Sequence, residues 1–358
     1  MDLRCPACGR KYADRWRCAC GSPLRFADRP LPDADAPADA GVDARAGLWA
    51  FEAFLPVERR VTLGEGFTPL IEAPEWDAAF KLEYVFPTGS FKDRGATTTL
   101  SRAVEVGADR VVEDSSGNAG AAIATYAARA GLPAEIYVPA DVKEPKVSAI
   151  RRAGADVVRV EGSRADVTDA CIEAVEAGDG WYASHAWNPA FFAGTATMAH
   201  EIAAQRDWSV PDAVVMPLGH GTMFLGACRG FRALRAAGWT DRMPRLLGAQ
   251  AAGYAPVVAE LNGEAAAAGE NSIADGIRIR DPVQMPGILD AIDDTGGDAI
   301  ALSSSAVSDE LDRLHRTGFY TEPTCAVAPA ALREYRDRGV VGPDEDVVVA
   351  LSGSGLKS

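Results

Sequence analysis

The sequence predicts an α/β protein with mostly parallel sheets, divided into more than one domain. From residue 47 onward, short apolar runs alternate with helical patterns, which is typical of βαβ units in a parallel sheet. A length of 358 residues suffices for two domains, or for one large domain with an appendage. Four of the seven cysteines crowd the first 20 residues, which indicates a separate N-terminal module.

The predicted elements follow one another in a regular order. Strands are expected at residues 80–84, 110–113, 134–138, 156–160, 181–184, 213–216, 246–249 and 347–351. Helices are expected from Lys92 to about Gly107 and at 118–129, 146–152 and 164–176. Ligands of such sheets bind where the ends of strands meet the starts of helices. We therefore expect the functional residues in these turns.

The charge of the chain limits the kinds of partner. The net charge is −15, from 51 acidic and 36 basic residues, so nucleic-acid phosphates would be repelled and we expect no nucleic-acid partner. No apolar run approaches the roughly 18 residues that span a bilayer. The N-terminus also lacks the pattern of a signal peptide. The sequence thus predicts a cytoplasmic protein with no membrane contact.

The N-terminal module carries two pairs of thiols, Cys5 with Cys8 and Cys18 with Cys20. Four thiolates in two pairs suit a tetrahedral zinc ion. A module that is too short to bury a core needs a cross-link such as a bound metal in order to fold. Disulfides are the alternative, which a reducing cytosol disfavours. The sequence therefore predicts a structural zinc ribbon at 1–28, followed by an acidic linker rich in Pro, Ala and Asp at 29–46.

The stretch PTGSFKDRG, from Pro87 to Gly95, places Lys92 between small and hydroxylated residues. A lysine amine can condense with an aldehyde cofactor once it has lost its proton. The alternative is a solvated helix start in which Ser90 is the N-cap and Asp93 lies near the positive end of the helix dipole. The nonapeptide alone does not distinguish a cofactor lysine from a solvated helix start. The later segments of the chain are needed to distinguish them.

Two further turns lie between a predicted strand and a predicted helix. Residues 115–120, SSGNAG, expose backbone N–H groups at a helix N-terminus and can hold an anion. Residues 217–223, PLGHGTM, form a glycine-rich turn that can wrap a phosphate group. Each of them alone is also consistent with an ordinary capped turn.

The PTGSFKDRG stretch resembles the cofactor-lysine motif of the threonine synthases and related fold-type II enzymes, which use pyridoxal 5'-phosphate (PLP). Residues 64–70, GEGFTPL, and 352–357, SGSGLK, are similar to further motifs of that family, as is the zinc ribbon. The resemblance implies a two-domain enzyme with a large PLP-binding domain over 47–95 and 185–358 and a smaller α/β domain over 96–184. It also implies a homodimer.

The resemblance assigns roles to single residues. Lys92 is expected to carry the cofactor and to remove the α-proton of the substrate, Asn118 to hydrogen-bond the cofactor ring, and Ser352 to face the pyridine nitrogen. A hydroxyl at that nitrogen makes the ring a weaker electron sink than a carboxylate would, which favours elimination and replacement at the substrate side chain. The cofactor phosphate is expected at Gly219, His220, Gly221, Thr222 and Met223, and the substrate at Ser115, Ser116, Gly117, Asn118, His185 and Asn188.

One segment departs from the pattern of the family. Where threonine synthases carry Asn-Pro-x-Arg followed by Gly-x-Lys-Thr, this chain reads NPAFFAGTAT, with Phe191 in place of the arginine and Ala196 in place of the lysine. A substrate phosphate thereby loses two charge-assisted hydrogen bonds, each worth about 1.5–3 kcal/mol, unless Arg94, His185 or Lys146 replaces them. A pocket with two phenylalanines would better accept threonine or serine.

These observations predict a PLP enzyme that acts on a small amino acid. The leading interpretation is a threonine synthase-like enzyme, which converts O-phosphohomoserine to threonine and phosphate by elimination and replacement. A threonine or serine ammonia-lyase, which gives a 2-keto acid and ammonia, is the alternative. A zinc-ribbon interaction protein on a dead enzyme scaffold is a third interpretation, and the joint presence of Lys92, Asn118 and Ser352 argues against it.

The acidic, lysine-poor composition predicts a halophile-like surface that salt stabilises. Six of the 36 basic residues are lysines, and the excess carboxylates repel one another until salt screens them. We expect the midpoint unfolding temperature, measured by scanning calorimetry, to rise as potassium chloride is increased toward molar concentration. A midpoint that does not rise with salt would refute this hypothesis.

Overall fold

The computed structural model describes residues 1–33, 35–36 and 41–357, so part of the predicted linker lies outside the described residues. Its contacts divide the chain into two compact units. The first unit comprises Met1–Leu31, Arg45–Gly66 and Lys92–Thr195, and the second comprises Pro32–Ala44, Phe67–Phe91 and Ala196–Ser358. This division assigns residues 47–66 and 185–195 to the first unit, whereas the sequence places them in the large domain. The predicted domain boundaries stay a prediction.

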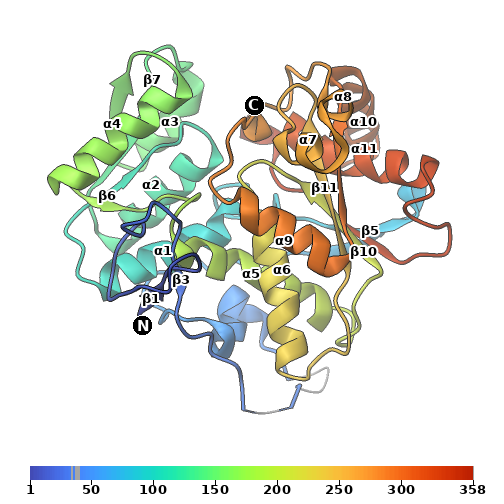
Figure 1. The fold of residues 1–358 in the computed structure, drawn as a ribbon, viewed down its shortest axis with the longest axis horizontal. Helices are drawn as coiled ribbons and strands as arrows, with labels where there is room; N and C mark the ends of the chain where they lie inside the picture. The colour runs from blue at the N-terminus through green and yellow to red at the C-terminus, as the bar shows by residue number, and fades with distance from the viewer. Residues whose placement is uncertain (34, 37–40, 358) are drawn as a thin grey trace. The chain divides into compact units, whose positions relative to one another are not determined.

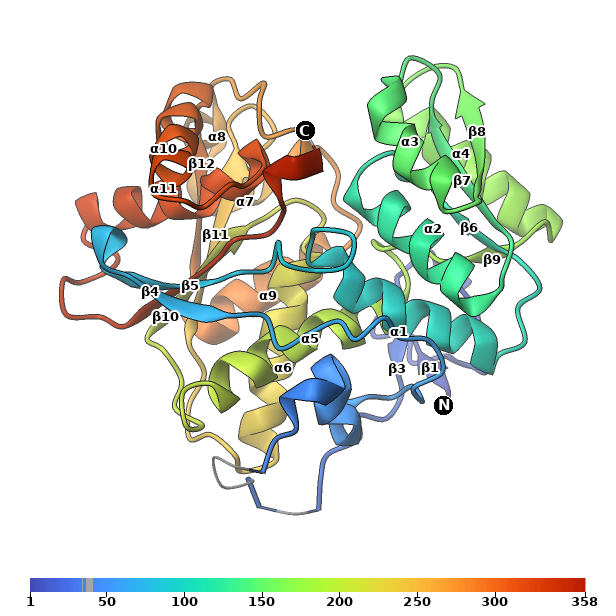
Figure 2. The same ribbon diagram turned by 180° about the vertical axis from the view of Figure 1, so that it is seen from behind.

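The first unit is built on a four-stranded parallel sheet with the order β8-β7-β6-β9 (Figure 2). Side chains alternate between the two faces of a strand. In β6, Val111 accordingly packs in an apolar cluster with α1, α2 and α3, whereas Val112 packs in a second cluster with α4. The elements are β6 (Val111–Glu113), β7 (Ala134–Pro139), β8 (Asp156–Val160), β9 (Trp181–Tyr182), α1 (Lys92–Glu105), α2 (Asn118–Ala130), α3 (Glu144–Arg152) and α4 (Arg164–Ala177).

The second unit is built on a six-stranded sheet with the order β12-β11-β10-β13-β5-β4. Figure 1 labels β5, β10 and β11 of this sheet. Neighbouring strands are parallel except β4 and β5. Helices α10 and α11 share one buried cluster with alternate strand residues such as Val215 and Val349. The strands are β4 (Leu70–Ala73), β5 (Ala78–Lys81), β10 (Ala213–Pro217), β11 (Arg245–Ala251), β12 (Asp298–Leu302) and β13 (Val347–Ala350).

The helices of this part of the chain complete the layers around the sheet. Helix α5 (Pro189–Ala204) begins in the first unit and ends in the second, since the boundary falls at Thr195. The others are α6 (Thr222–Ala236), α7 (Pro256–Asn262), α8 (Glu264–Ala267), α9 (Met285–Thr295), α10 (Ser304–Arg316) and α11 (Pro323–Asp337). Short 3-10 helices lie at Ala44–Phe54, Pro74–Trp76, Asp275–Ile277 and Gly355–Lys357.

The α/β class with mostly parallel sheets is confirmed, and most predicted elements agree with the structure to within two residues. The strand predicted at 80–84 is wrong in its bounds, because β5 ends at Lys81. There the chain leaves the sheet in a turn, in which the N–H of Glu83 donates to the carbonyl oxygen of Lys81 at 2.9 Å. Strands β4 and β12 were not predicted.

The N-terminal module is a small antiparallel sheet of β1 (Leu3–Arg4), β2 (Lys11–Tyr12) and β3 (Arg25–Phe26), in the order β2-β1-β3. Two turns bring its cysteines together. Gly9 and Gly21 follow the two thiol pairs with φ of 73° and 89°, a left-handed conformation that glycine adopts without strain. We call this module the ribbon.

The four cysteine sulfurs of the ribbon gather at one point, all within 4.8 Å of one another. The Sγ atoms of Cys5 and Cys20 are 3.6 Å apart, and those of Cys8 and Cys18 are 3.4 Å apart. A tetrahedral ion with sulfur ligands at about 2.3 Å spaces them about 3.8 Å apart, so the cluster fits such an ion. Hydrogen bonds from the Cys20 backbone and the Tyr12 hydroxyl lower the pKa of Cys18 to about 6. The cluster can thus hold a metal, and zinc stays a prediction.

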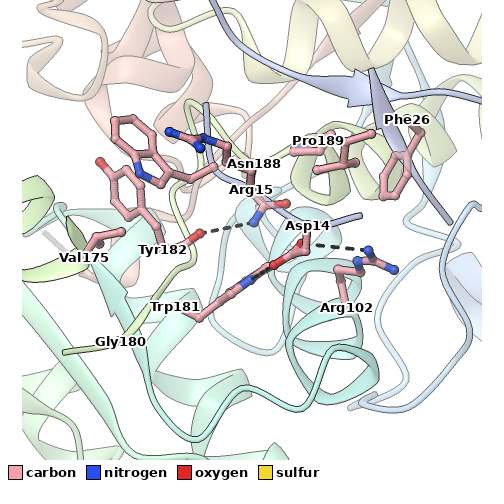
Figure 3. A pocket seen from close by; sticks show the side chains of 12 residues that line it. Asp14, Arg15, Phe26, Arg102, Val175, Gly180, Trp181, Tyr182, Asn188 and Pro189 are labelled. Atoms are coloured by element: carbon pink, nitrogen blue, oxygen red, sulfur yellow. Dashed lines mark hydrogen bonds and ion pairs between the residues drawn. The ribbon is translucent and has the colours of Figure 1, made fainter. Parts of the chain in front are cut away.

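The ribbon packs against α1 and β9 of the first unit (Figure 3). The buried Arg102 of α1 donates from Nη2 to the backbone oxygens of Met1, at 3.2 Å, and Ala13, at 3.1 Å. Trp181 donates from Nε1 to Asp14 at 2.9 Å. A cavity of about 150 Å³ remains between the two surfaces. Its lining includes Leu3, Trp16, Phe26, Tyr182, Asn188 and Pro189.

Across the described ranges, no helix is both long enough and apolar enough to cross a bilayer.

A buried ion pair holds β5 to the end of α5 in the second unit. Nζ of Lys81 lies 2.7 Å from a carboxylate oxygen of Glu201, and both side chains are fully buried. Changing Glu201→Gln would remove the negative charge from this buried pair, which we expect to lower the free energy of unfolding by about 3–5 kcal/mol. Chemical denaturation measures this change. The control is Asp312→Asn, which breaks the exposed pair with Arg316 and should cost nothing measurable.

Metal removal tests the ribbon. Cys8→Ser removes one of four ligands, so we expect the purified protein to lose its metal and the ribbon to unfold, because the module has too little core to fold alone. Elemental analysis measures the metal content, and limited proteolysis reports the folding of residues 1–28. Cys228→Ser, a buried thiol outside the cluster, should retain the metal. Unchanged metal content in the first variant would contradict the assignment.

Candidate active site

Lys92 is the first residue of α1, and the segment before it is fixed by backbone pairing. The N–H of Phe91 donates to the carbonyl oxygen of Ser352 at 3.1 Å, and the N–H of Ser354 donates to that of Gly89 at 2.9 Å. The chain after β13 therefore lies along the residues that lead into Lys92. Phe91, Asp93 and the residues that follow are buried, so the helix start is not solvated.

Ser352 offers a buried hydroxyl with no hydrogen-bond partner in the described part of the chain. The residue is 4% exposed, and its Oγ is one of eleven such atoms among the described residues. An unpaired buried hydroxyl is costly, so it points to a ligand atom that the protein itself does not supply. A pyridine nitrogen, which accepts a hydrogen bond from a hydroxyl, fits this place. Ser90, the alternative N-cap, likewise has a buried Oγ without a partner among the described residues, so it does not cap α1.

Helices α1 and α5 approach so closely that side chains are excluded at two points of the first unit. A Cβ on Gly194 would lie 1.8 Å from the carbonyl oxygen of Arg94, and a Cβ on Gly95 would lie 2.2 Å from the ring of Phe191. Phe191 is fully buried in the apolar cluster with Leu100. The residue that replaces the family's arginine thus packs beneath the first turns of α1.

Three side chains were considered as replacements for the missing arginine and lysine, and the structure describes two of them. Arg94 is fully buried on α1. His185 is neutral, because burial and the charge of Lys92 lower its pKa to about 3. The side chain of Lys146 lies outside the described residues. Neither Arg94 nor His185 therefore presents an exposed positive charge in the place of the missing arginine.

The turn of Ser115, Ser116, Gly117 and Asn118 connects β6 to α2, as predicted. These residues are partly exposed, and α2 begins at Asn118, so the backbone N–H groups of its first turn face outward from the sheet end. The tight turn requires glycine at 120, where a Cβ would lie 1.8 Å from the carbonyl oxygen of Ser115. The turn is thus preformed for an anion such as a carboxylate.

The glycine-rich turn of the second unit connects β10 to α6. Gly221 is the N-cap of α6 with φ of 80°, and Thr222 and Met223 form the first turn of the helix. A Cβ on Gly219 would lie 3.2 Å from the Cα of Ile277, so the turn is tightly packed against Ile277 at this position. Because β10 and β13 are parallel neighbours, this turn and Ser352 lie at the same edge of the sheet. His220 lies between the two glycines. These groups fit a phosphate and a pyridine ring.

Two residues of the first unit meet where β6 and β9 end. His185 Nδ1 lies 2.6 Å from Oε1 of Glu113, and the backbone N–H of His185 donates to Oε2 at 3.3 Å. Burial raises the pKa of Glu113 well above its usual range, and the neighbouring Asp114 raises it further. The sequence singled out His185 but missed Glu113. The signal that could have found it was a carboxylate as the last residue of a buried strand, two residues before the turn at 115–118, which we call the anion turn.

Asn188 uses both ends of its amide within the protein. Nδ2 donates to the carbonyl oxygen of Tyr182 at 3.2 Å, and Oδ1 accepts from the N–H of Ala190 at 3.0 Å. These bonds fix the start of α5, and the residue also lines the cavity beneath the ribbon (Figure 3). Its role as a substrate contact stays a prediction, as do the roles assigned to the other site residues.

Comparison with known proteins places this arrangement in a family. Residues 61–353 match the family described as pyridoxal-phosphate dependent enzyme. The threonine synthase of Methanosarcina acetivorans is 35% identical over 326 residues, which cover 87% of this chain and 80% of that protein. The threonine synthase of Methanocaldococcus jannaschii is 32% identical over 377 residues, which cover 100% of this chain and 93% of that protein.

Solved structures share the fold. The processed form of threonine deaminase isoform 2 from Solanum lycopersicum has a TM-score of 0.69 at 20% identity, covering 91% of this chain and 87% of that one. A pyridoxal 5'-phosphate-dependent aspartate racemase has a TM-score of 0.68 at 24% identity, covering 80% of this chain and 90% of that one. The chain therefore belongs to the family of pyridoxal-phosphate dependent enzymes, and within it to the fold-type II branch that contains the threonine synthases.

Proposed function

We propose that this protein is a PLP-dependent, threonine synthase-like enzyme that converts O-phosphohomoserine to threonine and phosphate. The observation that carries the proposal is the likeness to the threonine synthase of Methanocaldococcus jannaschii, which extends over the whole of this chain. The unpartnered hydroxyl of Ser352 supports it, because a serine at the pyridine nitrogen favours elimination and replacement at the substrate side chain. We further propose that the ribbon holds structural zinc and that the enzyme works in the cytoplasm, as a homodimer.

Each group of residues has one task in this proposal. Lys92 binds the cofactor covalently between turnovers and removes the α-proton of the substrate. Ser352 donates its hydroxyl to the pyridine nitrogen, and Asn118 donates to the ring oxygen. The cofactor phosphate is held by Gly219, His220, Gly221, Thr222 and Met223. The bound cofactor supplies an electron sink for the α-carbon.

The substrate carboxylate is bound by the anion turn. Ser115, Ser116, Gly117 and Asn118 present N–H groups and hydroxyls at the start of α2, where the helix dipole favours negative charge. Since the turn is already formed in the protein, the loss of conformational entropy on binding is small. This holds the α-carbon in a fixed position relative to the base that removes its proton.

A threonine or serine ammonia-lyase is the second candidate, and one observation favours it. Phe191 packs its ring against Gly95, and Ala196 stands in place of the lysine, so neither position offers a charge to a substrate phosphate. A free β-hydroxy amino acid needs no such cation. The product would then be a 2-keto acid and ammonia.

Product analysis distinguishes the two candidates. PLP-loaded protein is incubated separately with O-phosphohomoserine, threonine and serine, and phosphate, threonine, keto acid and ammonia are measured. We expect phosphate and threonine in equal amounts from the first substrate. Keto acid and ammonia from threonine or serine, with O-phosphohomoserine untouched, would make the protein an ammonia-lyase.

The control for this experiment is Lys92→Ala. This variant should fold, but it should lose the absorbance of covalently bound cofactor and turn over none of the three substrates, since no other amine is expected to replace the lysine. A normal cofactor spectrum in the variant would contradict the role of Lys92. Its circular dichroism spectrum checks that the fold is retained.

A further inference from the structure

Glu113 and His185 form a buried pair at the carboxyl edge of the sheet in the first unit. Strands β6 and β9 are parallel neighbours, so the residue that ends β6 and the residues that follow β9 meet at that edge. The carboxylate of Glu113 contacts His185 with both oxygens, one at Nδ1, at 2.6 Å, and one at the backbone N–H, at 3.3 Å. The side chains are 0% and 8% exposed. The contact is therefore fixed and shielded from water.

The charges around the pair favour its neutral form. Burial raises the pKa of Glu113, Asp114 raises it further, and Arg164 and Lys92 oppose this. Burial lowers the pKa of His185, as do the charges of Lys92 and Arg164, whereas Asp114 opposes this. The two groups together therefore hold one ionisable proton between Oε1 and Nδ1 at neutral pH.

The pair lies close to the reacting region of the first unit. The charge of Lys92 lowers the pKa of both Glu113 and His185. The ring of His185 also contacts that of Phe191, with centroids 6.1 Å apart, and Phe191 in turn packs on Gly95, one turn after Lys92. Glu113 stands two residues before Ser115, the start of the anion turn.

We propose that Glu113 and His185 form a one-proton relay that moves a proton to or from the oxygen bonded to the β-carbon of the substrate. The relay rests on the proposed function, and it serves both candidate reactions. Water addition in a threonine synthase forms a bond between oxygen and the β-carbon, and loss of hydroxide in an ammonia-lyase breaks one. These steps are the reverse of each other.

The transfer is balanced in both directions. When the hydroxyl leaves, the electron pair at the α-carbon forms the new carbon–carbon double bond, and the C–O pair goes to oxygen. Nε2–H of His185 gives its proton to that oxygen, so water is released, while the carboxyl proton of Glu113 moves to Nδ1. When water adds, Nε2 takes a proton from the attacking water and Nδ1–H returns its proton to the Glu113 carboxylate. No oxidant or reductant is needed.

There is a chemical reason for the proton on oxygen to be transferred by a group other than Lys92. Lys92 takes the α-proton and thereby becomes an ammonium ion. The same proton is needed later, when a carbon atom of the substrate is protonated. A second acid–base pair can protonate oxygen without waiting for the lysine. In the relay, His185 is the member that exchanges a proton with the substrate, and Glu113 acts through it as a positioning residue that fixes the tautomer.

The test separates the α-proton step from the C–O step. Glu113→Gln and His185→Asn are compared with wild type on whichever of O-phosphohomoserine, threonine and serine the wild type turns over. Exchange of the α-proton into D2O is followed by NMR, together with threonine or keto acid formation. We expect exchange to stay within a few-fold of wild type and C–O bond making or breaking to fall about 100-fold or more.

The control is Glu310→Gln, a fully buried carboxylate of the second unit that accepts a hydrogen bond from Nε1 of Trp76 and has no role in the proposed site. It should change both steps by the same factor. If Glu113→Gln and His185→Asn also slow both steps equally, or slow neither, the relay is wrong. If wild type turns over none of the three substrates, the proposed function fails, and the role at the β-oxygen fails with it.

A second readout is independent of turnover. The chain has four histidines, so a protein labelled with 15N at histidine gives four ring systems, and His185→Asn identifies the one of interest. A proton held in a buried 2.6 Å hydrogen bond should give a downfield resonance coupled to Nδ1, protected from exchange with water. Loss of this resonance in Glu113→Gln supports the pair. Its absence from wild type, with or without PLP, would overturn the proposal.

Discussion

Helix α1 begins inside the protein, and the rest of the site depends on this constraint. Its first residue follows a segment whose backbone is paired with residues 352–354, so the lysine is fixed by main-chain hydrogen bonds rather than by a flexible loop. The next turns are buried against α5, with glycine at 95 and 194 where the two helices touch. A larger residue at either position would displace the helix that carries the lysine. Tight packing of small residues thus determines where the reactive amine lies.

Each unit presents its functional groups at the carboxyl edge of its own sheet. In the first unit the anion turn follows β6 and His185 follows β9, which are neighbours. In the second unit the glycine-rich turn follows β10 and Ser352 follows β13, which are also neighbours. Parallel strands force these turns to one edge, and helix starts there leave N–H groups unpaired. The architecture therefore places unpaired N–H groups, which can bind an anion, at the edge where the candidate residues lie.

The sequence predicted what depends on local pattern. Strand and helix periods, the turns between them and the gathering of four cysteines all follow from residues close in the chain. The strand at 80–84 was misplaced, because the alternation continues past Lys81 while the backbone leaves the sheet there. Local pattern cannot show which alternating residues remain paired with a neighbouring strand.

What the sequence could not predict depends on contacts between distant residues. The pair of Glu113 and His185 joins residues 72 positions apart, and it exists because β6 and β9 are adjacent, a topology that no single segment encodes. Phe191 was interpreted as part of a substrate pocket, but its packing under α1 became visible only with the helix crossing in place. The side-chain amide of Asn188 likewise forms hydrogen bonds that fix the start of α5.

The replacement of the family's arginine by Phe191 and the buried pair of Glu113 and His185 bear on different steps of the reaction. A cation near the substrate side chain decides whether a phosphate ester binds, and this chain offers none at Phe191 or Ala196. The proposed acid–base pair would act on the bond between oxygen and the β-carbon, which one candidate reaction makes and the other breaks. If Ser352 lies at the pyridine nitrogen, as proposed, it would favour this side-chain chemistry over transamination in either case. The proposed reaction type therefore rests on residues that are buried and held by the fold. Recognition of a phosphate leaving group would instead depend on positive charges, and positions 191 and 196 carry buried apolar side chains.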